Sequence, residues 1–100
     1  IFAVILPDAE PATAVRVAER LRTEIGRCAV QAEGGPLPLT ASVGGAEALS
    51  TDDGTNLLRR TAEALDAAVR SGGNASYFHN GQWSETAAAA LERAASAPAT

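Results

Sequence analysis

The sequence contains no lysine, no methionine, a single cysteine and very few aromatic residues. The one cysteine, Cys28, excludes an internal disulfide and a metal centre built from cysteines. Aromatic residues make up only 4% of the 100 residues, although 46% are hydrophobic, so the core has to be built from Ala, Val and Leu. A small domain with small core side chains buries little apolar surface. We therefore expect the isolated chain to be marginally stable.

Basic clusters and long apolar runs are also missing. The net charge is −4, and the eight arginines are scattered along the chain, which argues against a nucleic-acid surface. No apolar run approaches the length of a membrane span, so we expect no membrane contact from this segment. A single unpaired cysteine fits a reducing compartment, and the sequence thus favours a cytoplasmic location.

The first six residues, Ile1 to Leu6, are all apolar and are followed by Pro7-Asp8. Such a run predicts a strand buried on both faces of a sheet. A buried strand at the first residue implies that preceding structure is absent. We therefore expect the chain to be the second part of a domain.

Alternating helix and strand signals follow. Apolar residues at helical spacing from Pro11 to Ile25 predict an amphipathic helix. A hairpin is predicted next, with strands 28–33 and 37–43 joined by a turn at 34–36.

The second half begins with a cap cluster at 51–54, which predicts a helix running to about Arg70. A short strand at 75–79 and the turn dipeptide Asn80-Gly81 lead to a brief partner strand at 82–83. Ser84 is then the predicted cap of an alanine-rich helix from about 85 to 95, before a flexible tail at 96–100. The predicted fold class is α/β, an α+β sandwich whose central sheet is flanked by helices.

Three segments together resemble the C-terminal portion of a GGDEF domain, the diguanylate cyclase family. Residues 2–7 (FAVILP) resemble the stretch from the signature Phe to a Pro, residues 39–44 (LTASVG) the family's LTxSxG strand, and residues 61–74 the end of its ADxALYxAKxxGRN helix. The resemblance covers residues 1 to about 79. It assigns 1–83 to a GGDEF portion, with 84–100 as an additional alanine-rich helix and flexible tail.

This resemblance implies a nucleotide-cyclase or palm-like fold whose N-terminal half is missing. The family joins two GTP molecules into cyclic di-GMP with Mg²⁺, so GTP and Mg²⁺ are cofactors implied by the family only. Ile1 occupies the expected acidic position and cannot bind a metal ion, which leaves no catalytic residue and no metal ligand in the chain. Val69 and Gly73 stand at the two positions of the family's phosphate-binding cations, leaving Arg70 and Asn74 as candidate phosphate contacts.

Three other features have ordinary structural explanations. His79, the only histidine, lies beside a turn with no second metal ligand near it in sequence, so we expect a surface residue. Cys28 follows a helix C-terminus and is expected to be a small buried residue. Asp52-Asp53-Gly54 lacks the spaced ligands of a calcium loop, and helix capping explains it.

Three functional hypotheses remain open. The first is a degenerate GGDEF domain of a bacterial signalling protein, acting as a regulatory or dimerising module. Its implied partners are a second copy of the chain or other domains of the parent protein. The second is an active cyclase whose acidic motif lies upstream of Ile1 and in which Arg70 replaces the lost cation. The third is an unrelated small α/β interaction module, which a structure without a central strand at 1–6 beside strand 39–43 would favour.

Overall fold

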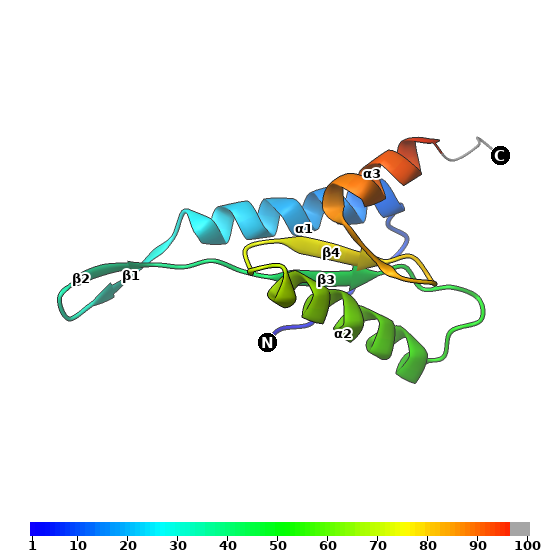
Figure 1. Ribbon diagram of the computed structural model, residues 1–100, viewed down its shortest axis with the longest axis horizontal. Coiled ribbons are helices and arrows are strands. Elements are labelled where there is room, and N and C mark those ends of the chain that lie inside the picture. Colours follow the sequence, from blue (N-terminus) through cyan, green and yellow to red (C-terminus); the bar gives the residue numbers. More distant parts are fainter. Residues whose placement is uncertain (97–100) are drawn as a thin grey trace.

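The computed structural model describes residues 1–96, which form an α+β fold of three helices and two small sheets (Figure 1). This confirms the predicted fold class. In chain order the elements are α1 (Pro11–Gly26), β1 (Ala29–Ala32), β2 (Gly35–Pro38), β3 (Val43–Ala46), α2 (Gly54–Arg70), β4 (Ser76–His79), β5 (Ser84–Thr86) and α3 (Ala87–Ser96). Both long helices were predicted within one to three residues of their observed ends.

The larger sheet has the strand order β3-β4-β5. Strands β3 and β4 run parallel, with Val43 opposite Ser76, and α2 is the crossover helix between them. Strand β5 returns antiparallel to β4. In the hairpin turn, the Asn80 N–H donates to the Trp83 carbonyl at 3.0 Å, so the predicted Asn80-Gly81 turn is confirmed.

Helices cover both faces of this sheet. Helix α2 lies on one face, and α1 and α3 lie on the other (Figure 1). Because side chains alternate along a strand, Phe78 of β4 packs towards α1 and α3, while its neighbour His79 turns towards α2. Within residues 1–96 the buried hydrophobic side chains are one valine and five alanines: Val15, Ala18, Ala64, Ala68, Ala87 and Ala90. The core is as thin as the composition predicts.

Close packing of α2 on β3 depends on Gly44. A Cβ atom at this position would lie 2.2 Å from the backbone nitrogen of Leu65 in α2. Backbone atoms cannot rotate out of the way as a side chain can, so any larger residue would push the helix off the sheet. The last glycine of the LTASVG segment therefore has a packing role here.

The hairpin β1–β2 projects from the rest of the molecule as an arm (Figure 1). Its register pairs Val30 with Leu37 and Ala32 with Gly35. The predicted hairpin is present, but its second strand begins at Gly35 rather than at residue 37. The predicted strand 37–43 is divided, because residues up to Pro38 pair with β1 whereas residues from Val43 onward pair with β4.

The prediction of a buried strand at residues 1–6 is wrong. This segment forms no strand, and Ile1, Phe2 and Ile5 are 109%, 97% and 86% exposed. A strand needs a neighbour that supplies hydrogen-bond partners, and in the described sheet the only neighbour of β3 is β4. The apolar run has the composition of a strand without the pairing that would make it one.

The bounds of the last two elements also differ from the prediction. The strand after the turn is Ser84–Thr86 rather than 82–83, because Asn80 Oδ1 accepts from the backbone N–H groups of Gln82 and Trp83 and so holds both in the turn. Helix α3 begins at Ala87, and its cap is Thr86, whose Oγ1 accepts from Ala89 N–H at 3.1 Å. Ser84 is therefore not the cap.

The predicted flexible tail falls mostly at 97–100, outside the described residues. Among the helices within residues 1–96, none is both long enough and apolar enough to cross a lipid bilayer.

Candidate functional site

The C-terminal end of α2 is where the resemblance places phosphate contacts. Val69 is 56% exposed there, and Gly73 follows in the turn with a φ of 78°. The guanidinium of Arg70 lies on the helix surface, where its Nε is 2.8 Å from Asp66 Oδ2. Both side chains of this pair are largely exposed. The end of α2 thus presents an apolar side chain and a cation that already has an acidic neighbour.

Asn74 lies in the turn after α2 with a φ of 49°, in the left-handed region. Its Oδ1 accepts a hydrogen bond from Arg22 Nη1 at 2.9 Å. Arg22 comes from α1, so the structure joins Asn74 to a residue 52 positions earlier. It does not pair Asn74 with Arg70.

Arg22 is itself held by Glu19, one turn earlier in α1. The distance from Arg22 Nε to Glu19 Oε2 is 2.7 Å, and the same carboxylate oxygen accepts from Ser76 Oγ at 2.8 Å. The Arg22 hydrogen bond, and secondarily that from Ser76, holds the pKa of Glu19 below its usual value. The same carboxylate raises the pKa of Arg22. Ser76 is buried at the start of β4.

An open depression of about 270 Å³ lies over this cluster. Its walls come from α1, the turn after α2, β4 and the first residues of α3. The charges that line it are Glu19 and Arg22, which neutralise each other. The depression is consequently polar but offers no free positive charge to a phosphate.

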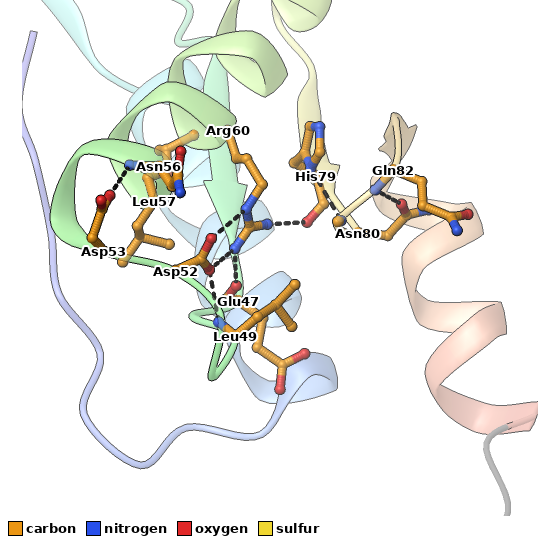
Figure 2. Close-up of polar contacts among 12 residues, drawn as sticks. Glu47, Leu49, Asp52, Asp53, Asn56, Leu57, Arg60, His79, Asn80 and Gln82 are labelled. Carbon is orange, nitrogen blue, oxygen red and sulfur yellow. Dashed lines mark hydrogen bonds and ion pairs between the residues drawn. The ribbon is translucent and has the colours of Figure 1, made fainter.

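A second polar cluster lies between α2, β4 and the loop after β3 (Figure 2). The buried guanidinium of Arg60 forms an ion pair with Asp52, through Nη2 and through Nε at 3.2 Å. It also donates to the backbone carbonyls of Glu47 and His79. The Leu49 N–H donates to Asp52 Oδ2 at 2.8 Å. The Arg60 hydrogen bond, with that from Leu49, lowers the pKa of Asp52.

His79 belongs to this cluster, and its predicted surface location is wrong. It is 6% exposed, because the last residue of β4 turns its side chain under α2. Its Nδ1 accepts from the Gly81 N–H at 3.0 Å, and its Nε2 lies 3.1 Å from Glu63 Oε2. Because Nδ1 acts as an acceptor, the Nε2–H group is the one that donates a hydrogen bond to Glu63.

Sequence reasoning missed Arg60, although a signal was present. Arg60 shares the face of α2 that carries Ala64 and Ala68, and a charged residue on an apolar helix face needs a buried partner. Asp52 and Asp53 were both expected to cap α2. Only Asp53 does so, since its Oδ1 accepts from Asn56 N–H at 2.7 Å, whereas Asp52 turns to Arg60 (Figure 2).

Cys28 was expected to be buried, and it is exposed. It lies at the base of the projecting hairpin, where no helix covers it, and its thiol donates to the Glu24 carbonyl. Within residues 1–96 no group of three or more His, Cys, Asp or Glu side chains is arranged to hold a metal ion.

Comparison with known proteins adds no relative: no family model, no curated protein and no solved structure matches this chain. The two polar clusters must therefore be interpreted from their own chemistry. In both, the cation is paired with a carboxylate, and every partner named above comes from the chain itself. Such clusters hold elements together: one joins α1 to β4, and the other joins α2 to the loop after β3.

Proposed function

We propose that the chain is part of a divergent, cytoplasmic GGDEF-type domain that has lost phosphate binding and serves as a regulatory or dimerising module. The observation that carries the proposal is the end of α2. There Val69 and Gly73 replace cations, Arg70 is paired with Asp66, and Arg22, which contacts Asn74, is paired with Glu19. The parallel unit β3–α2–β4, with Gly44 packed against α2, supports the family assignment.

The described residues do not fit a Mg²⁺–GTP pair. A triphosphate carries several negative charges and is bound tightly only where charge-assisted donors are free to meet it. Mg²⁺ in such sites is held by carboxylates, and the residue at the expected acidic position, Ile1, is a fully exposed aliphatic side chain.

The test is a calorimetric titration of the chain with GTP and Mg²⁺. We expect no measurable binding by the wild type at millimolar GTP, because Arg70 at the end of α2 and Arg22 beside the following turn are each already paired with a carboxylate. Val69→Lys should introduce weak, salt-sensitive GTP binding, since it restores a positive charge at the family's position. Leu58→Lys, which adds the same charge at another exposed apolar position of α2, is the matched control and should bind no GTP.

Two results would overturn the proposal. Micromolar GTP binding by the wild type, or its conversion of GTP to cyclic di-GMP, would support an active cyclase. That alternative requires Arg70 to leave Asp66 and bind phosphate.

A second candidate function is an interaction module unrelated to GGDEF domains. The exposed apolar segment 1–6, which pairs with no strand of the described sheet, favours it. Equal GTP affinities of Val69→Lys and Leu58→Lys in the titration would support this candidate. The end of α2 would then bind phosphate no better than another exposed position of the same helix.

A further inference from the structure

The arm formed by β1 and β2 lacks the packing that usually stabilises a sheet. The two strands contact each other and project away from the helices and the larger sheet (Figure 1). A two-stranded hairpin is marginal in water, and a third strand or a covering helix is what normally stabilises it. The arm is therefore the part of the described chain that gains most from an added strand.

Prolines determine which edge of the arm can accept that strand. Pro36 lies opposite Gln31, and Pro38 lies opposite Ala29. Because proline has no N–H, these two pairs are of the non-hydrogen-bonded type, and the outer edge of β2 has no donor at either position. By the same geometry, the N–H and carbonyl groups of Ala29 and Gln31 face outward from β1. The open edge is thus that of β1 alone.

One face of the arm is apolar and uncovered. Val30 and Leu37 are directly opposite each other, so their side chains share a face, and they are 47% and 54% exposed. A strand added at the open edge of β1 would extend this apolar pair into a larger apolar face.

We propose that the outer edge of β1 pairs antiparallel with β1 of a second copy of this chain. A two-fold axis beside Val30 places Ala29 opposite the partner's Gln31, so the outward groups form two pairs of two hydrogen bonds each. Arg27, which also contacts Glu24, precedes β1, and Glu33 follows it. Antiparallel pairing of two copies therefore brings the cationic end of one β1 towards the acidic end of the other, so the edge is self-complementary in charge.

This pairing cannot continue to a third copy of the chain. The four-stranded sheet β2-β1-β1-β2 has a proline-blocked strand at each outer edge, so growth stops at the dimer. The Leu37, Val30, Val30 and Leu37 side chains form one continuous apolar row across it. The inference rests on the proposed function in one respect, namely that a dimerising module needs a surface for self-association.

Cysteine cross-linking in the full chain tests the register. In a Cys28→Ser background, Val30→Cys places two thiols in directly opposed positions about 5 Å apart at Cβ, within reach of a disulfide. Leu37→Cys is the matched control, because it is equally exposed on the same face. The two Leu37 positions are three strand spacings, about 14 Å, apart, which is too far for a disulfide. We expect a covalent dimer on mild oxidation for Val30→Cys and not for Leu37→Cys.

A proline substitution tests the hydrogen bonds. Gln31→Pro removes an outward donor of β1 while leaving the bonds between β1 and β2 intact, as Pro36 does on the other strand. We expect it to abolish the Val30→Cys cross-link and to leave the circular dichroism spectrum unchanged. Sedimentation of the wild type at increasing concentration should show a monomer–dimer equilibrium that Gln31→Pro removes.

Equal cross-linking of the two cysteine variants, a wild type that stays monomeric, or persistent dimers of Gln31→Pro would each overturn the inference. These measurements involve no nucleotide. A chain that dimerises through β1 but binds GTP tightly would refute the proposed loss of phosphate binding alone. A monomer without GTP affinity would refute the dimer alone.

Discussion

Arg60 and Asp52 show how single residues tie this fold together. Their side chains are 4% and 8% exposed, and the guanidinium contacts the loop after β3 and the end of β4 as well as the carboxylate (Figure 2). Removing one partner from a buried pair leaves the other charge unsatisfied, which costs far more than the loss of a surface pair. Arg70 and Asp66 form such a surface pair.

The Asp52 carboxyl predicts an acid-sensitive stability. Its pKa is lower in the folded chain than in the unfolded chain, because Arg60 stabilises the carboxylate. The pair therefore contributes stability above the unfolded pKa of about 3.9 and loses it as the pH falls through the folded pKa. We expect Asp52→Asn to be less stable than the wild type at pH 7 and to lose less stability between pH 5 and pH 3, measured by urea unfolding.

Asp66→Asn is the control for this prediction, since it removes a carboxylate that pairs with an arginine on the exposed surface of α2 rather than in the interior. It should follow the wild-type pH profile. Parallel stability profiles for the wild type and Asp52→Asn would contradict the argument.

At the scale of elements, α2 packs closely against β3, and a glycine in the strand makes that contact possible. The parallel pair β3–β4 needs a crossover helix on one face, and α2 approaches β3 until its backbone at Leu65 occupies the space a Cβ of Gly44 would fill. Gly45 on the opposite side faces the ring of Phe78, a side chain that can move.

Gly44→Ala should destabilise the fold by about 3 kcal/mol, because α2 has to shift as a whole to admit the methyl group. Guanidinium unfolding followed by circular dichroism measures the loss. The control is Gly26→Ala at the end of α1, where a Cβ meets no atom within 4 Å. That change should stabilise the helix by about 0.5–1 kcal/mol. Equal stability of the two variants would contradict this account of the packing.

At the scale of the whole molecule, apolar side chains are distributed unusually. Five of the six buried hydrophobic residues are alanines, whereas large apolar side chains of the segment 1–6, the arm and the outer face of α2 are exposed. A core of this kind buries little apolar area per residue, so the folded chain has little stability in reserve. Its exposed apolar surface is available to partners.

Removal of residues 1–6 should leave the unfolding free energy unchanged within about 0.5 kcal/mol, because all six residues are exposed and Ile1, Phe2 and Ile5 are almost fully so. It should also reduce binding of a hydrophobic dye, since it deletes exposed apolar surface. Thermal unfolding and dye fluorescence measure the two effects. Val15→Ala, a truncation in the buried core, is the control that should destabilise the chain. A clear stability loss on deletion would show that the segment packs on the domain.

Much of the fold was predictable from local patterns. Helical spacing located α1 and α2, Asn80-Gly81 located the turn between β4 and β5, and the glycine pair before Pro36 located the arm. The errors at residues 1–6 and 37–43 have one cause, which is that strand formation depends on a neighbour. Residues 1–6 are the most apolar run of the chain and form no strand, whereas the small residues 43–46 form one because β4 lies beside them.

The candidate site, like the fold, was only partly predictable from local patterns. Asn74 could be singled out from the sequence, but its partner Arg22 could not, because the two are far apart in the chain and meet only when α1 packs beside the turn after α2. The burial of His79 depended on the alternation of β4 and on the position of α2 above it.

The sequence by itself determined the helices, the turns, the thin alanine core and the absence of cations at Val69 and Gly73, because these follow from each residue's own side chain and its near neighbours. Tertiary structure alone decided which strands pair, that Arg60 and Asp52 meet in the interior, that segment 1–6 stands exposed and that β1 keeps an open edge. Those outcomes depend on hydrogen bonds and ion pairs between residues distant in sequence. Such bonds form only when packing brings both partners together and removes the water that would otherwise satisfy them.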